Sequence, residues 1–326
     1  MGCAVLAGIQ KTEGRPLAGK IQQDLRLMSE CYGHEPVMAA QTADLMVTDK
    51  DGVYLDATLG MGGHARAVLE RLGPKGRLVG LDWDPEMAAY ARRNLADFGS
   101  RVTVIESNFA NLDEALRREG IESVSGALFD LGVSSLHFDK PSRGFSIRND
   151  GPLDMRINPS NPLTAAAIIN QWPYEQIEHL IRVVGERWST RISRAIIQKR
   201  EKKPIETTGE LARIIENAVP VRGLKTHPAT RTFLAVRVAV NYEFDNLTRG
   251  MQKVASFVKP GGRMGVITFH SLEDRIVKET FRLKIKLGDW NPVTRKPAVP
   301  SDEETAANRR ARSAKLRVIE KVQEGK

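Results

Sequence analysis

The hydrophobic pattern of the chain first predicts a strand, a turn and a helix. Residues 52–55 form a short apolar run that ends at Asp56, and after a glycine turn residues 65–72 place apolar side chains at helical spacing. Gly73-Pro74 ends this helix, because proline cannot continue it. Residues 77–81 then form a second apolar strand, so the pattern predicts one βαβ unit.

The alternation of strands and helices continues as far as residue 130. The pattern predicts helices at 85–95 and 112–118, and strands at 102–106 and 124–130. Strands that alternate with helices at this spacing form a parallel, doubly wound sheet, whose ligands bind outside the carboxyl ends of the strands. Four candidate site residues therefore fall along one edge of the predicted sheet: Gly62, Asp82, Phe109 and Asp130.

The strand pattern disappears between residues 141 and 226. Helical spacing there predicts helices separated by proline or glycine, at 164–171, 174–185, 191–200 and 208–218. Beyond them we expect helices at 229–240 and 247–258, a fifth strand at 263–269 and a terminal strand at 316–322. The middle of the chain is therefore predicted to be a helical insertion between the fourth and fifth strands of the sheet.

Composition narrows the class of protein. The 326 residues include 41% hydrophobic and 27% charged residues, an ordinary globular mixture, and no apolar run approaches the roughly 18–20 residues of a membrane span. Two cysteines are too few for a disulfide framework or a zinc knuckle, which fits a reducing compartment. The net charge of +9 permits a polyanionic partner, and basic residues gather in the helical insertion and in the tail. Residues 1–30 show little periodicity, and we expect them to be a poorly ordered extension.

The glycine turn and the strand after it carry the chemistry of nucleotide-type cofactor binding. Glycines let a ligand approach the backbone, and Asp82, 20 residues beyond Gly62, can accept hydrogen bonds from ribose hydroxyls. A pyrophosphate cradle requires a third spaced glycine, which the turn of Gly60, Gly62 and Gly63 lacks. The carboxylate of Asp56 would repel a pyrophosphate but attract the sulfonium and ammonium groups of S-adenosylmethionine. The residues therefore favour a methyl-donor enzyme over an NAD(P)-linked oxidoreductase, with a non-catalytic RNA-binding factor as a further alternative.

Five motifs together resemble one family. They are Gly60-Met61-Gly62-Gly63-His64; Leu131-Gly132-Val133-Ser134-Ser135 after Asp130; Arg143-Gly144-Phe145-Ser146 with Asp150-Gly151-Pro152-Leu153-Asp154-Met155-Arg156; His227-Pro228-Ala229-Thr230-Arg231-Thr232-Phe233; and Phe269-His270-Ser271-Leu272-Glu273-Asp274-Arg275-Ile276-Val277-Lys278. In this order and spacing they are similar to the ribosomal RNA small subunit methyltransferase H family, also called MraW. The resemblance extends from about His34 to Arg317.

The resemblance implies a fold, a reaction and a partner. The fold would be an α/β, doubly wound, Rossmann-like methyltransferase sheet over residues 31–140 and 227–326, with a helical substrate-recognition domain inserted at 141–226. The reaction would be S-adenosylmethionine-dependent methylation of the N4 amine of a cytidine in the decoding centre of 16S rRNA, without a metal. The partner would be the small ribosomal subunit in the bacterial cytoplasm, and a homodimer stays open.

The family's cofactor positions fall on particular residues of this chain. They are Gly62, Gly63, His64, Asp82, Phe109 and Asp130, and a further contact, usually a glutamine, falls on His137. An acceptor near the N4 amine would take its proton, so Asp130 is assigned to cofactor binding first and to catalysis second. No aromatic residue directly follows Asp130 to sandwich the base. His270, Glu273, Asp274 and Arg275 would either line the RNA side or cap and ion-pair a helix.

Overall fold

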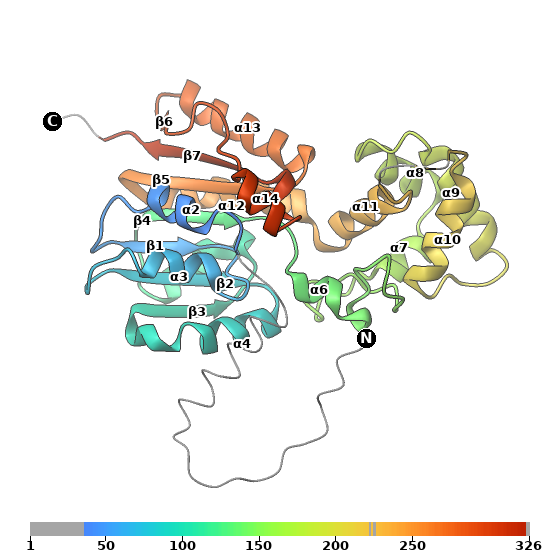
Figure 1. The fold of residues 1–326 in the computed structure, drawn as a ribbon, viewed down its shortest axis with the longest axis horizontal. Coiled ribbons are helices and arrows are strands. Elements are labelled where there is room, and N and C mark those ends of the chain that lie inside the picture. The colour runs from blue at the N-terminus through green and yellow to red at the C-terminus, as the bar shows by residue number, and fades with distance from the viewer. Residues whose placement is uncertain (1–35, 222, 224–225, 324–326) are drawn as a thin grey trace, which may run out of the picture. The chain divides into compact units, whose positions relative to one another are not determined.

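The computed structural model describes residues 36–221, 223 and 226–323 (Figure 1). The extension predicted at residues 1–30 lies outside the described residues. Within the described part of the chain, no helix is both long and apolar enough to cross a membrane.

A seven-stranded sheet forms the first part of the fold, in the strand order β3-β2-β1-β4-β5-β7-β6. The strands are β1 (Val53–Asp56), β2 (Arg77–Asp82), β3 (Val102–Glu106), β4 (Val124–Asp130), β5 (Val258–Thr268), β6 (Trp290–Pro292) and β7 (Lys315–Lys321). Neighbours from β3 to β5 run parallel, whereas β7 runs antiparallel to both β5 and β6. The predicted doubly wound sheet is confirmed, with β7 as the predicted terminal strand. The pattern missed β6 because this strand has only three residues.

Helices cover both faces of the sheet (Figure 1). They are α2 (Ala39–Met46), α3 (Gly63–Leu69), α4 (Pro85–Asn94), α5 (Leu112–Arg118), α12 (Glu243–Phe257), α13 (Ser271–Lys286) and α14 (Asp302–Ala307), with short 3-10 turns η1 (Ala96–Arg101), η2 (Phe109–Asn111) and η4 (Ala311–Ser313). Alternate side chains of a strand point to opposite faces. Leu55 therefore packs with α5, α12 and α13, whereas its neighbour Tyr54 packs with α2, α3 and α4.

A second hydrophobic core belongs to the helices that follow β4 and precede α12. These helices are α6 (Ser135–Asp139), η3 (Pro141–Arg143), α7 (Ala165–Gln171), α8 (Tyr174–Val183), α9 (Ser189–Arg200), α10 (Thr208–Ala218) and α11 (Thr230–Asn241). The helical insertion is thus observed, and its core runs from Phe145 to Val240. Phe233 and Val236 of α11 pack in this core rather than against the sheet. We therefore propose that the inserted module extends through α11, to Asn241, rather than ending at residue 226.

Candidate active site

Three carboxylates end neighbouring parallel strands at one edge of the sheet. Asp56 is the last residue of β1, Asp82 of β2 and Asp130 of β4. Because β1 pairs in parallel with both β2 and β4, the three strand ends share the same edge. The tertiary structure thus brings together side chains that are up to 74 residues apart in the sequence (130 − 56 = 74).

The glycine turn after β1 is held against the end of β2. Gly60 has φ 54° and Gly62 has φ 88°, a left-handed conformation that favours glycine. A Cβ atom on Gly62 would lie 3.0 Å from Leu95 Cδ1, and one on Gly63 would lie 2.8 Å from Pro36 Cγ. The Gly60 amide donates to Asp82 Oδ2 over 2.7 Å. The turn therefore needs glycines both for its backbone conformation and for its close packing.

Asp82 is fixed by two backbone amides. Besides the bond from Gly60, its Oδ1 accepts a hydrogen bond of 2.8 Å from the Asp84 amide. Burial raises the pKa of the Asp82 carboxyl to about 7, although both backbone bonds act in the opposite direction. Each carboxylate oxygen keeps a further lone pair, so the group is oriented to accept bonds from a ligand.

His64 lies between the two other carboxylates. Its Nε2 is 3.4 Å from Asp130 Oδ2, an ion-pair distance, and its side chain is buried. Burial alone would lower the pKa of His64, but the charges of Asp130 and Asp56 outweigh it and raise that pKa. Among the described residues, four buried atoms of this cluster have no hydrogen-bond partner: Asp56 Oδ2, His64 Nδ1, His64 Nε2 and Asp130 Oδ1. Buried polar atoms of this kind normally have partners, so they mark the place where a ligand would complete the site.

Asp56 makes the stability of the ligand-free protein depend on pH. Burial raises the pKa of this carboxyl to about 6, against 3.8 for a free aspartate. The folded state therefore holds its proton more tightly, and the stability that Asp56 contributes is lost as the pH rises from about 4 to 6. Asp56→Asn should then stabilise the ligand-free protein at pH 8 by up to ~3 kcal/mol, since one pKa unit corresponds to about 1.4 kcal/mol.

Urea unfolding of both proteins at pH 4 and pH 8 measures this effect. Asp51→Asn, which changes an exposed carboxyl shortly before β1, is the matched control. Its free energy of unfolding should change between pH 4 and pH 8 by the same amount as that of the wild type. Equal free energies of unfolding for wild type and Asp56→Asn at pH 8 would contradict the buried charge.

Phe109 lies in the loop after β3, on the α12 side of the sheet. It begins η2, and its ring meets Phe129 edge-on with centroids 5.6 Å apart and an interplanar angle of 88°. A Cβ atom on Gly250 of α12 would lie only 2.7 Å from Phe109 Cδ2. The ring position of Phe109 therefore depends on a glycine in a helix that is more than 100 residues away in the sequence.

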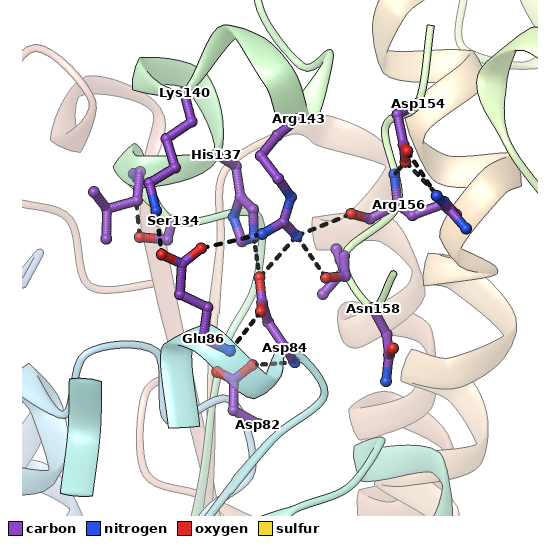
Figure 2. Close-up of polar contacts among 12 residues, drawn as sticks. Asp82, Asp84, Glu86, Ser134, His137, Lys140, Arg143, Asp154, Arg156 and Asn158 are labelled. Atoms are coloured by element: carbon purple, nitrogen blue, oxygen red, sulfur yellow. Dashed lines mark hydrogen bonds and ion pairs between the residues drawn. The ribbon is translucent and has the colours of Figure 1, made fainter. Parts of the chain in front are cut away.

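His137 contacts Asp84, a residue that no motif of the sequence marked as part of the site. Its ring is buried on α6, stacks at a tilt on Phe145 with centroids 5.0 Å apart, and places Nε2 2.8 Å from Asp84 Oδ2 (Figure 2). Arg143 contacts the same oxygen of Asp84 over 2.8 Å. The only sequence signals for this contact were the helix start at Asp84-Pro85 and the motif that begins at Arg143, and neither predicted that they meet.

The polar residues that follow β5 cap α13 and form ion pairs with β7. His270 is the N-cap of α13, and its side chain and that of Glu273 form a reciprocal capping box. Asp274 pairs with Lys315 over 3.2 Å and with Arg317 over 2.8 Å, which joins α13 to β7. Arg275 is exposed. Capping and ion pairing therefore account for His270, Glu273 and Asp274.

The site combines three carboxylates with one histidine. Among the described residues, no cluster of three histidine, cysteine or acidic side chains could hold a metal ion. The unpartnered oxygens of Asp56 and Asp130 can accept bonds from a cationic group, and the oriented carboxylate of Asp82 can accept bonds from hydroxyls. This donor and acceptor set fits a ligand that carries an ammonium, a sulfonium and a ribose.

Comparisons with the sequences of known proteins agree with this chemistry. Residues 31–322 match the model of the MraW methylase family. The ribosomal RNA small subunit methyltransferase H of Symbiobacterium thermophilum is 44% identical over 314 residues, covering 90% of this chain and 98% of that protein. The protein of the same name from Carboxydothermus hydrogenoformans is 44% identical over 308 residues, covering 89% and 98%. A crystal structure of an rRNA methylase from Streptococcus thermophilus superposes with a TM-score of 0.41 at 12% identity, covering 96% of this chain and 100% of that one. The chain belongs to the MraW methylase family, so it is a methyltransferase and its cofactor is S-adenosylmethionine.

Proposed function

We propose that the protein methylates the N4 amine of a cytidine in the decoding centre of 16S rRNA, in the small ribosomal subunit in the cytoplasm. The main support for this proposal is the carboxylate of Asp130 at the end of β4, beside the glycine turn. Its Oδ1 has no hydrogen-bond partner among the described residues, so it can bind the amine of the target base. The names of relatives at 42–44% identity, ribosomal RNA small subunit methyltransferase H, support the substrate.

The residues around the glycine turn would hold S-adenosylmethionine, which when bound supplies a methyl group on a cationic sulfur. Asp82 accepts the ribose hydroxyls, and the backbone of Gly62 and Gly63 lets the ligand approach closely. Asp56 and Asp130 offer carboxylate oxygens to the cationic groups, with His64 between them. His137 contacts Asp84, whose amide binds Asp82, and a direct contact of His137 with the cofactor stays a prediction.

Asp130 also has the chemistry to take the proton that the amine must lose. The lone pair of the cytosine amine is conjugated into the ring, so the amine is a poor nucleophile unless an acceptor binds its hydrogen. A carboxylate oxygen within hydrogen-bond distance of the amine localises that lone pair and accepts the proton. The target base must leave its RNA stack to reach the carboxylate, as base-modifying enzymes generally require.

The inserted module supplies positive charge for an RNA backbone. Its exposed basic side chains include Arg187, Arg191, Arg194, Lys199, Lys202, Lys203 and Arg213. Arg222 and Lys225, which the sequence places in the same insertion, lie outside the described residues. Neutralising phosphates with such side chains gives salt-dependent, sequence-independent affinity. We therefore assign the RNA to this module, whereas the homodimer stays a prediction.

A methyl-transfer assay with base mapping tests the proposed function. Radiolabelled S-adenosylmethionine is incubated with the protein and with small subunits that lack the methylation, and the RNA is then digested to nucleosides. The label should elute as N4-methylcytidine, and in a parallel sample cut into oligonucleotides it should map to the decoding centre. Label in another nucleoside would refute the proposed target, and no label at all would favour a non-catalytic RNA-binding factor.

Gly250→Ala should weaken binding of the methyl donor by moving Phe109. We place the Phe109 ring beside the adenine of the methyl donor. The added methyl group would meet this ring at 2.7 Å, closer than real contacts allow, so the ring must shift. We expect a ~5-fold rise in KM for S-adenosylmethionine, since overpacking typically costs about 1–3 kcal/mol. Phe109→Leu removes the same ring, so in that background Gly250→Ala should raise KM little further, whereas a further equal rise would indicate damage to α12. A KM unchanged in Gly250→Ala would remove Phe109 from the site.

A further inference from the structure

A network of charged side chains connects the start of α4 with the segment that leads into the helical module. Its members are Asp84, Glu86, His137, Lys140 and Arg143 (Figure 2). Asp84 and Glu86 belong to the start of α4, and the other three belong to α6 and η3 or lie between them. The residues come from segments more than 50 positions apart, so only the tertiary structure assembles the network.

Asp84 lies at the centre of the network and touches Asp82. Its side chain is only 1% exposed, its Oδ1 accepts the Glu86 amide over 2.8 Å, and its own amide donates to Asp82 over 2.8 Å. The second oxygen, Oδ2, contacts His137 and Arg143. Burial alone would raise the pKa of Asp84, but the hydrogen bond from His137 and the charge of Arg143 outweigh it, and the pKa is lowered. Asp84 is therefore held as a buried anion.

Arg143 joins this anion to the helical module. The nitrogen that contacts Asp84 also donates to the carbonyl of Ile157 over 2.7 Å and to that of Arg156 over 3.1 Å. The other terminal nitrogen lies 3.4 Å from Glu86 Oε2, and Lys140 pairs with the same carboxylate. One guanidinium thus connects the loop after β2 with a loop of the inserted module, and its side chain is 15% exposed.

We propose that Arg143 is a positioning residue for the methyl donor, which acts by fixing Asp84 and thereby the carboxylate of Asp82. The inference rests on the proposed role of Asp82 in binding the ribose. Removal of Arg143 leaves Asp84 as a buried anion with one side-chain donor, His137, and the segment must move to hydrate it. That movement takes the Asp84 amide away from Asp82 and leaves Asp82 free to turn from the ligand.

Calorimetric titration with S-adenosylhomocysteine measures the effect without any turnover. Arg143→Met should weaken binding by ~10-fold or more, as expected when a hydrogen bond to a charged group is lost. Arg143→Lys keeps the positive charge but cannot span Asp84 and two carbonyls, so it should fall between Arg143→Met and wild type. In turnover, KM for S-adenosylmethionine should rise while kcat at saturating donor changes little.

Arg156→Met is the matched control. Arg156 lies in the same region of the module, is 24% exposed, and pairs with Asp154 over 2.8 Å, but it reaches no residue of α4 by its side chain (Figure 2). The carbonyl of residue 156 that Arg143 contacts belongs to the backbone and is kept in Arg156→Met, so this replacement should leave binding of S-adenosylhomocysteine unchanged. Equal losses in Arg156→Met and Arg143→Met would mean that general loosening of the module, and not the contact with Asp84, weakens binding.

A double-mutant cycle with Asp84→Asn separates positioning from a structural role. If Arg143 acts through Asp84, then Arg143→Met in the Asp84→Asn background should cost little further affinity. Fully additive losses would overturn the inference, as would wild-type binding by Arg143→Met. Asp82→Ala distinguishes the two levels of the proposal: if it weakens binding while Arg143→Met does not, only the positioning role fails. If Asp82→Ala binds like wild type, the proposed role of Asp82 fails as well.

Discussion

Replacing Asp130 by asparagine should lower the rate of methyl transfer by about 10²–10⁴-fold, the usual contribution of a positioned proton acceptor. The amide of asparagine has nearly the same shape but cannot take up a proton at neutral pH. The backbone amide of residue 130 would still donate to Thr58 Oγ1 over 2.6 Å, so the end of β4 should keep its place. Single-turnover transfer of labelled methyl to small subunits measures the loss at saturating donor.

Glu122→Gln is the matched control for this change. Glu122 is an exposed carboxyl close to the opposite end of the same strand, and its replacement removes the same charge from the protein. We expect wild-type transfer from this variant. If Asp130→Asn kept more than a tenth of the wild-type rate, the proton acceptor would have to be another group. A matching loss in Glu122→Gln would trace the effect to net charge.

The second large effect is expected on cofactor binding by Asp82→Ala. The carboxylate of Asp82 accepts hydrogen bonds from the Gly60 and Asp84 amides, and its remaining lone pairs can accept bonds from the ribose. Alanine therefore removes the acceptor for both the glycine turn and the ligand. A hydrogen bond to a charged group contributes about 1.5–3 kcal/mol, and two such bonds to the ribose correspond to a loss of ~100-fold or more in affinity. Calorimetric titration with S-adenosylhomocysteine measures the dissociation constant directly.

Thermal unfolding of Asp82→Ala without ligand distinguishes a loss of hydrogen-bond acceptors in the site from a loss of the folded structure. A cooperative transition close to that of wild type, together with lost binding, assigns the effect to the site. Glu122→Gln again serves as the control and should bind with unchanged affinity. Binding within 3-fold of wild type by a folded Asp82→Ala would contradict the assignment of the ribose to this carboxylate.

Local patterning was sufficient to predict most of the secondary structure. The strands that end in Asp56, Asp82 and Asp130, and the helices α7 to α10 of the insertion, follow from side-chain periodicity over ten or so neighbouring residues. The rule that ligands bind at the carboxyl ends of parallel strands then predicted that these carboxylates share one edge. The sequence pattern did not predict β6, because three residues are too few to show an alternation of hydrophobic and polar side chains.

The sequence by itself determined the order of strands and helices, the insertion and the carboxylates at the strand ends, because each of these depends on residues close together in the chain. Only the tertiary structure decided that α11 packs in the core of the inserted module. It alone also decided that Arg143 and His137 meet Asp84. Those contacts join residues 53 and 59 positions apart in the chain. In the sequence alone, His137, Arg143 and Asp84 could equally well lie on a solvated surface, and only the fold buries them against one another.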